Sequence, residues 1–188
     1  MDQRVLIEGI RTRDTAAIRL LVDTFQSRVL NTVISLVRNR EDSEEICQDV
    51  FVEVIHSVAT FRTEAALATW IYRIAINKSL DFLRMKKRKK RFAFLLSLFG
   101  EANELRHDIP DLVHPGVLME RKEDAGYFFR ALDQLSDNQK TAIVLSLIEG
   151  LSYREISEVM KTSESSVESL LVRGKQNLRK TLEKYYKT

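Results

Sequence analysis

The sequence contains few of the two residue types that most often end a helix or form a turn. Its 188 residues include only two Pro and six Gly. An all-β protein of this size would need more of both, because its many turns depend on them. Long stretches with regularly spaced apolar residues and no such breaks therefore predict a helical protein.

Cysteine is also nearly absent, and Cys47 is the single one in the sequence. An intramolecular disulfide and a four-cysteine zinc site are thereby excluded. Because Cys47 falls on the apolar side of an expected helix, we interpret it as a small core residue rather than a redox sensor.

Long apolar runs are missing as well. The longest, Phe92–Phe99, is interrupted by Ser97 and is far shorter than the roughly 20 residues that a membrane-spanning helix needs. The N-terminal residues carry charges throughout and lack the apolar core of a signal peptide. We therefore expect a soluble cytoplasmic protein that does not insert into membranes.

The sequence lacks the usual signatures of a catalytic or metal site. Its three histidines, His56, His107 and His114, do not have the spacing of metal ligands. No Gly-rich phosphate loop, nucleophile elbow or pair of carboxylates is present. A helical enzyme is therefore the least favoured hypothesis, and we expect no catalytic residue, no metal and no cofactor.

Positive charge is concentrated in one place. The formal net charge is only +3, yet seven of the residues from Arg84 to Arg91 are Lys or Arg. Such a block favours contact with phosphates or with another anionic surface. A solvated basic segment without a partner is the alternative.

Residues 1–91 have the pattern of a compact helical bundle. Asp14 is a suitable N-cap for a long helix whose apolar residues repeat every three or four positions. Asp42 and Glu45 predict a capping box at the start of the next helix. A further helix is expected over roughly 66–87.

Residues 92–123 lack sustained periodicity and contain both prolines, so we interpret them as a linker. The apolar segment Phe92–Phe99 is expected to pack back on the first bundle, with contact to a partner protein as the alternative. A second helical domain is predicted over 124–188. The fold class is thus all-α, with two helical domains joined by a linker.

Three local signals divide the second domain into helices. Ser136 with Gln139 and Ser152 with Glu155 each predict a capping box at a helix start. Gly150, between them, is expected to end a helix.

The last two expected helices have the pattern of a helix-turn-helix. A short helix over 153–160 is followed by a turn at 161–163 and a longer helix over 164–185. In this motif the second helix lies in the major groove of DNA. Its polar N-terminal residues can hold phosphates or read base edges. A helical hairpin without a DNA function is the alternative.

A mixture of aromatic, amide and cationic side chains follows the third expected helix. Single-stranded nucleic acid requires this combination, because unstacked bases need flat faces, base edges need amides and the backbone needs cations. Burial of Phe61 and Trp70 in the core is the alternative. The residues of this group are Phe61, Trp70, Tyr72, Arg73, Asn77 and Lys78.

Two stretches of the sequence resemble parts of a known protein family. Residues 44–84, EEICQDVFVEVIHSVATFRTEAALATWIYRIAINKSLDFLR, look like region two of the extracytoplasmic-function (ECF) sigma factors, in the sigma-70 family. Residues 132–180, LDQLSDNQKTAIVLSLIEGLSYREISEVMKTSESSVESLLVRGKQNLRK, are similar to their region four. Two such motifs in the expected order, with a linker between them, make the resemblance specific.

The resemblance implies that a polar stripe on the third helix faces the clamp helices of the largest polymerase subunit. This stripe lies opposite the apolar positions Ile46, Val50 and Val54, although an ordinary solvated surface would show the same pattern. The candidate polymerase-binding residues are Glu45, Gln48, Asp49 and Glu53.

The resemblance also implies that the loop from Phe61 to Thr69 reads the minus-ten promoter element, where a base leaves the stack. The following helix would support that pocket and the melted strand, and basic residues would hold phosphates. The candidate minus-ten residues are Phe61, Arg62, Thr69, Trp70, Arg73, Asn77, Lys78, Arg84, Lys87 and Arg88.

For region four, the resemblance implies contact with the minus-thirty-five element as duplex DNA. Glu168 and Leu170 stand where many family members carry a basic residue. Because a carboxylate accepts a hydrogen bond from cytosine N4 and repels phosphates, we expect the recognised sequence to differ from that of the best-known members. The candidate residues are Ser165, Ser166, Glu168, Ser169, Val172 and Arg173.

The function implied by this resemblance is that of a sigma factor. Such a protein binds bacterial core RNA polymerase and directs promoter recognition, DNA melting and transcription initiation. Expected partners are the core polymerase, promoter DNA as duplex and as melted single strand, and an anti-sigma factor. The free protein is expected to be a monomer. The alternative is a helix-turn-helix transcriptional regulator that acts without polymerase.

Overall fold

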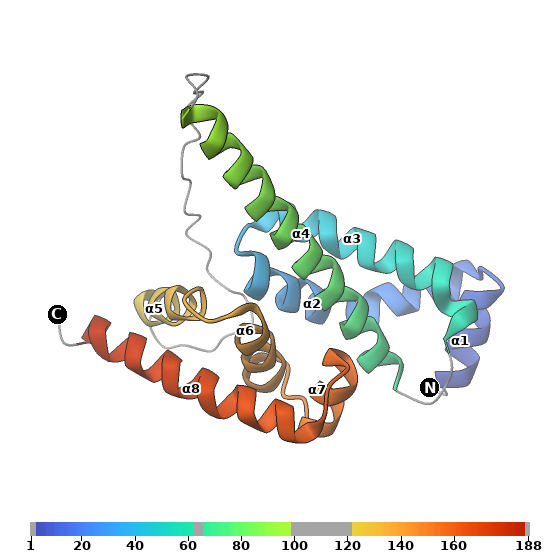
Figure 1. Cartoon of the computed structure of the whole chain (residues 1–188). Helices are drawn as coiled ribbons and strands as arrows, with labels where there is room; N and C mark the ends of the chain where they lie inside the picture. The colour runs from blue at the N-terminus through green and yellow to red at the C-terminus, as the bar shows by residue number, and fades with distance from the viewer. Residues whose placement is uncertain (1–2, 62–65, 99–121, 187–188) are drawn as a thin grey trace.

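The structure is a computed structural model that describes residues 3–61, 66–98 and 122–186, and these residues are helical without any strand. The expected all-α fold is confirmed (Figure 1). The elements of the first half are α1 (Gln3–Arg11), α2 (Thr15–Val37), α3 (Arg40–Ser57), the 3-10 helix η1 (Val58–Thr60) and α4 (Leu67–Leu98). Those of the second half are α5 (Lys122–Leu132), α6 (Asp137–Ile143), the π-helical segment η2 (Val144–Ile148), α7 (Tyr153–Met160) and α8 (Glu164–Tyr186).

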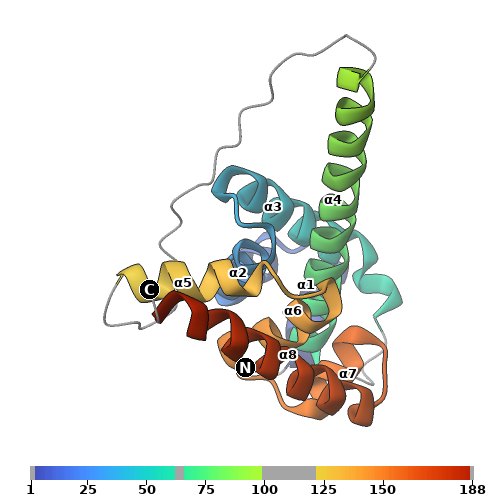
Figure 2. The same ribbon diagram turned by 60° about the vertical axis from the view of Figure 1, so that its left-hand side comes forward.

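Two groups of helices are visible in both ribbon views. Helices α1 to α4 form one bundle, and the end of α4 extends well beyond it (Figures 1 and 2). Helices α5 to α8 form the second group, which lies against α2 and α4. Within the described residues no helix is both long enough and apolar enough to cross a membrane.

The helix caps agree only in part with the sequence signals. Asp14 caps α2 as predicted, since its carboxylate accepts a hydrogen bond from the backbone N–H of Ala16 at 3.1 Å. The capping box at Asp42 is wrong, because α3 begins earlier. Asn39 has extended backbone angles, and its side chain accepts from the N–H of Asp42 at 2.7 Å.

The second half contains one complete capping box of the two predicted. The Ser152–Glu155 box is confirmed, with the Ser152 N–H donating to the Glu155 carboxylate at 2.8 Å. Ser136 precedes α6 in an extended conformation, but its side chain makes no capping hydrogen bond. Gly150 follows the end of η2 with φ of 70°, a left-handed conformation that glycine adopts without strain.

Helix α4 does not stop near residue 87, where the sequence suggested its end. It continues to Leu98, so the basic block is part of the helix. Neither Gly nor Pro occurs in α4, and Lys and Arg favour helix nearly as strongly as Ala. A helical block presents its positive charges around an exposed rod, with all residues from 84 to 92 exposed.

The expected return of the apolar segment Phe92–Phe99 to the bundle is wrong at its first residue. The side chain of Phe92 is 64% exposed on α4. The remaining side chains of this segment lie outside the described residues.

The buried apolar side chains of the two groups form one continuous cluster. It includes Leu36 and Ile76 from the first group and Phe129 and Leu145 from the second. The two halves therefore share a core in this structure.

Candidate nucleic-acid and polymerase interfaces

Helices α7 and α8 form the helix-turn-helix expected from the sequence. Ile156 and Val159 of α7 are buried against the side of α8 that carries Val167 and Leu171. Lys161 joins the helices in a left-handed conformation with φ of 52°. Its backbone N–H donates to Ser157 and closes α7, so the direction of α8 is set by local geometry as well as by packing.

The outer face of α8 is open to solvent near its N-terminus. Of the candidate minus-thirty-five residues, Ser166 is partly exposed and the others are exposed. Ser163 precedes the helix, and its hydroxyl accepts from the N–H of Ser166 at 3.2 Å. Arg173 donates from Nε to the carbonyl of Ser169 at 3.1 Å, which directs the guanidinium along this same face. The exposed candidates are Ser165, Glu168, Ser169, Val172 and Arg173.

The candidate polymerase-binding residues form a single exposed stripe. Glu45, Gln48, Asp49 and Glu53 are all exposed on α3, while Ile46, Val50 and Val54 on its other side are buried. Only Glu53 has an ion pair among those found for this stripe, with Lys78 of α4 at 3.8 Å. The stripe thus presents acidic and amide groups to solvent.

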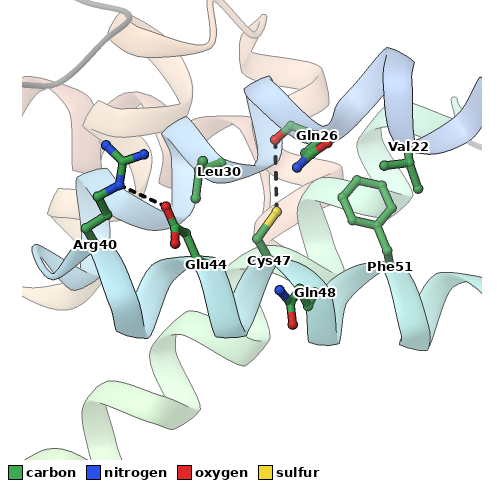
Figure 3. Close-up of a pocket in the computed structure, with 8 residues that line it drawn as sticks. All are labelled: Val22, Gln26, Leu30, Arg40, Glu44, Cys47, Gln48 and Phe51. Carbon is green, nitrogen blue, oxygen red and sulfur yellow. Dashed lines mark hydrogen bonds and ion pairs between the residues drawn. The ribbon is translucent and has the colours of Figure 1, made fainter.

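A groove between α2 and α3 borders this stripe (Figure 3). Arg40 and Glu44 lie at one end of it and are joined by an ion pair of 2.8 Å. Cys47 lines its floor, and its thiol contacts the carbonyl of Gln26 at 4.0 Å. Burial, with a smaller contribution from Glu44, raises the pKa of Cys47 to about 11. The residues that line the groove are Val22, Gln26, Leu30, Arg40, Glu44, Cys47, Gln48 and Phe51.

The aromatic pair of the minus-ten candidates belongs largely to the core. Phe61 is 5% exposed, and its ring lies 4.9 Å from that of Trp70, which is partly buried. Thr69 is 2% exposed. In this arrangement Phe61 and Thr69 offer little surface to a base. Arg62 lies outside the described residues.

The more distal minus-ten candidates are accessible along α4. Asn77 is exposed and Lys78 is partly exposed. Arg84, Lys87 and Arg88 are exposed in the helical basic block. Arg84 pairs with Asp81 at 2.9 Å and Lys87 with Asp137 of α6 at 3.0 Å. These surface pairs are weak and leave the cations available to phosphates.

Arg73 differs from the other cationic candidates because its guanidinium is hydrogen-bonded to the second half of the chain. Its guanidinium donates to the backbone carbonyl of Glu158 in α7, from Nε at 3.1 Å and from Nη2 at 2.6 Å. Its neighbour Tyr72 is 1% exposed and donates to the carboxylate of Glu149 at 2.7 Å. The second half of the chain therefore covers the part of α4 that carries these two residues.

Comparison with known families assigns both halves of the chain. A family model for sigma-70 region 2 matches residues 21–89, and one for sigma-70 region 4 matches residues 126–178. These matches contain the α3 stripe, the start of α4 and the helix-turn-helix.

Curated relatives extend over nearly the whole chain. The ECF RNA polymerase sigma-E factor of Haemophilus influenzae is 30% identical over 176 residues, which cover 94% of this chain and 93% of that protein. The RNA polymerase sigma-H factor of Pseudomonas aeruginosa is 29% identical over 178 residues, covering 95% and 92%. The chain belongs to the ECF sigma factors of the sigma-70 family, which are transcription initiation factors.

Two solved structures share the fold. CnrH in complex with the cytosolic domain of CnrY superposes with a TM-score of 0.70 at 20% identity, over 96% of each chain. The sigma factor RpoE of Bartonella quintana, in complex with the anti-sigma factor NepR, gives 0.67 at 21% identity, over 88% of this chain and 96% of that one.

Proposed function

We propose that this chain binds core RNA polymerase and directs it to promoters, with the α3 stripe as the main polymerase contact. The observation that carries the proposal is that sigma-70 region 2 and sigma-70 region 4 both match within one chain, at residues 21–89 and 126–178. A regulator that acts without polymerase would need the helix-turn-helix alone. The stripe and the group around Trp70 would then have no role.

The α3 stripe supports polymerase docking because of its exposure and its chemistry. Four polar or acidic side chains lie in a row on a helix whose other side is packed in the core. A rigid acidic stripe can pair with basic groups on a partner and speed up their encounter. Gln48 also borders the groove that contains Cys47, whose lining combines the apolar Val22, Leu30 and Phe51 with polar side chains.

Helix α8 supports recognition of duplex DNA. Its serines and the N–H groups at the start of its first turn, before Ser166, can position phosphates, while side chains further along reach base edges. Glu168 and Arg173 are exposed on the same face. Glu168 can accept from cytosine N4 and Arg173 can donate to guanine O6 and N7, so this pair favours a sequence with both bases.

The region around Trp70 supports capture of the melted strand. Extruding a base costs a few kcal/mol, and stacking on an aromatic side chain returns about 1–3 kcal/mol per base. Because this cost and this gain are similar in size, small differences between bases decide whether the strands separate, and melting depends on the promoter sequence. Asn77 and the basic part of α4 would hold the strand once it has separated.

An anti-sigma factor and a cytoplasmic location follow from the same proposal. RpoE of Bartonella quintana was solved with the anti-sigma factor NepR, and this chain shares its fold. We expect an inhibitory partner of this class here as well. Because core polymerase and promoter DNA lie in the cytoplasm, the chain acts there, and it takes no catalytic role itself.

A pull-down with purified bacterial core RNA polymerase tests the proposal. The wild-type chain is expected to be retained, and the Gln48→Ala, Asp49→Arg double variant is expected to lose at least tenfold in affinity, because a charge in the interface is reversed. Asp23→Arg is the matched control, since Asp23 is exposed on α2 outside the stripe. A folded wild-type chain that does not bind would contradict the proposal and favour the polymerase-independent regulator.

A further inference from the structure

The far end of α4 projects from the molecule as a rod. In both ribbon views this light green end lies well away from the other helices (Figures 1 and 2). All side chains from Arg84 to Phe92 are exposed. Because a helix rises 1.5 Å per residue, this exposed part is about 12 Å long. Within the part of the chain that the structure describes, the rod is accessible around its whole circumference.

The rod carries charge of one sign. Seven of the eight residues from Arg84 to Arg91 are Lys or Arg, and no acidic residue occurs between Asp81 and Glu101. Successive residues of a helix point about 100° apart, so the four consecutive cations at positions 88–91 point in four different directions. The cations therefore surround the helix and do not form a stripe on one face.

Ion pairs with acidic residues are found at the end of the block that lies nearest to the bundle. Lys86 pairs with Asp42 of α3 at 2.9 Å, and Lys87 pairs with Asp137 of α6 at 3.0 Å. Exposed pairs of this kind contribute little to stability and exchange readily for other anions. The block therefore remains available to a larger anionic surface.

An apolar segment follows the cations along the same helix. Phe92 is 64% exposed, and the backbone remains helical to Leu98. Six of the seven residues from Phe92 to Leu98 are apolar in the sequence, and Ser97 is the exception. The end of α4 is thus ordered along its axis, with cations first and apolar residues after them.

An anionic lipid surface matches this order of groups. Headgroups can surround a helix end and contact cations on all of its sides, and clusters of Lys and Arg beside apolar residues are typical of segments that bind such surfaces. The cationic part is about 10 Å long, and one headgroup layer is roughly 5–8 Å thick. The apolar residues beyond it would meet the acyl chains. Seven residues are too few to cross a hydrocarbon core of about 30 Å, so the contact is peripheral.

Duplex DNA and a protein surface match the rod less well. A duplex would lie along one side and would leave Phe92 and the cations of the other side without a partner. Protein interfaces are depleted of Lys, and four of the eight residues from Arg84 to Arg91 are Lys. The cations Arg84, Lys87 and Arg88 are also candidates for promoter DNA, and they cannot hold lipid and DNA at the same time.

We propose that the end of α4, from Arg84 to Leu98, binds the surface of an anionic phospholipid bilayer. Its cations lie among the headgroups, and its apolar residues lie at the acyl chains. This contact goes beyond the sigma function and does not depend on it. A chain held in this way cannot offer its basic block to a promoter, so lipid binding withholds the chain from DNA.

Sedimentation of the full-length chain with phospholipid vesicles tests the proposal. One set of vesicles contains equal parts of phosphatidylglycerol and phosphatidylcholine, and the other contains phosphatidylcholine alone. We expect binding to the anionic vesicles to be tighter by about tenfold or more, because each Lys or Arg near an anionic surface strengthens binding by about fivefold. Raising the salt concentration should weaken this binding, since salt screens exposed charges.

The cationic part of the site is tested by charge reversal. Lys89→Glu with Arg91→Glu should weaken binding to the anionic vesicles by about tenfold or more. Lys175→Glu with Lys180→Glu is the matched control, because both residues are exposed on α8 and the net charge changes equally. This control should bind like the unaltered chain. All four side chains are exposed, so circular dichroism should show unchanged helix content.

The apolar part of the site is tested at its exposed first residue. Phe92→Ser should weaken vesicle binding by about tenfold, because an aromatic side chain no longer leaves water on binding. Val5→Ser is the control, since Val5 is also 64% exposed but lies on α1. It should leave vesicle binding unchanged.

Loss of binding in both tip variants, with both controls unaffected, would support the proposal. Equal binding to the two kinds of vesicle, or no binding, would overturn it, and so would unchanged binding in either tip variant. An equal loss in the α8 control would indicate general charge attraction and would also overturn it. If the chain binds a mixed-sequence duplex through Lys89 and Arg91 but does not bind vesicles, DNA is the partner of the block and the proposal is wrong. The assay contains no polymerase, so its result and that of the pull-down can fail separately.

Discussion

Cys47 illustrates how strongly the environment of one residue controls its chemistry. It lies on α3 beneath the groove shared with α2, where it is 5% exposed. Burial is the main cause of its raised pKa, and the nearby carboxylate of Glu44 adds to it. Since the thiolate is the reactive form, the residue is suited to packing and not to redox sensing.

Alkylation of Cys47 by iodoacetamide should therefore be slow in the native chain. With a pKa of about 11, roughly one molecule in a thousand carries the thiolate at pH 8. The rate should keep rising above about pH 10, where an ordinary cysteine with a pKa near 8.5 has levelled off. Glu44→Gln removes the repulsive charge and should move the profile to lower pH. A native rate equal to that of the urea-unfolded chain would contradict the assignment.

Tyr72 and Glu149 show where reasoning from sequence ends at the residue scale. The sequence placed Tyr72 in a group suited to nucleic acid and gave Glu149 no role. Their contact joins residues 77 positions apart, and no periodicity or spacing reports such a pairing. Arg73 was identified as a candidate site residue, but its bond to the backbone of α7 depends on tertiary packing that the sequence pattern does not contain.

At the scale of elements, the sequence predicts the helices better than it predicts where they begin and end. Apolar periodicity predicted the helices themselves, because each helix needs one face for the core. The caps were less certain, since several polar residues near a boundary can serve. Asn39 rather than Asp42 is the N-cap of α3, because the backbone is extended at Asn39. The predicted end of α4 near residue 87 is too early, because the prediction treats the basic residues as a block after the helix, whereas Lys and Arg themselves favour helix and α4 runs to Leu98.

The Ser152–Glu155 capping box gives a prediction for α7. Ser152→Ala should lower the free energy of unfolding by about 1 kcal/mol, a common cost for losing an N-cap side chain. Ser157→Ala in the same helix is the matched control, because its hydroxyl only donates to the carbonyl of Arg154. Urea unfolding followed by circular dichroism measures both. If the two substitutions lowered the free energy of unfolding equally, the capping box would contribute no more stability than the hydroxyl of Ser157.

The same box predicts a dependence on pH. Hydrogen bonds from Ser152 lower the pKa of Glu155 below its ordinary value. Glu155 therefore contributes stability above the ordinary carboxyl pKa, and this contribution is lost as pH falls through the lowered folded value. The gap between wild type and Ser152→Ala should narrow below about pH 4, near the ordinary glutamate pKa. A gap that stays constant into acid would contradict the role of the Glu155 carboxylate.

At the scale of the whole molecule, the relation between the two halves matters most. The sequence predicted two helical domains and a linker, and the fold and family bear this out. It could not predict that the halves share one continuous core, because each half already has an apolar face that explains its own periodicity. The polar contacts of Glu149 and Lys140 with residues of the first half add specificity to this shared core, since buried charges are costly in any other arrangement.

Cooperative unfolding is the consequence that can be measured. Because the core is continuous, the wild-type chain should show one calorimetric transition with equal calorimetric and van't Hoff enthalpies. The Glu149→Ala, Tyr72→Phe variant should show two transitions, or one broad transition with a smaller van't Hoff enthalpy. The reason is that each half keeps its own helices but loses the contacts that couple it to the other.

A control variant and three possible results show whether the two halves unfold together. Glu183→Ala should leave a single transition, because its ion pair with Arg179 lies within α8 and is exposed. Two separate transitions in the wild-type chain would mean that the halves are already independent, and a shared core would not hold in solution. A single transition that moves to lower temperature in the double variant would mean that apolar contacts alone keep the halves coupled. In that case Glu149 would contribute to stability without determining whether the two halves unfold together.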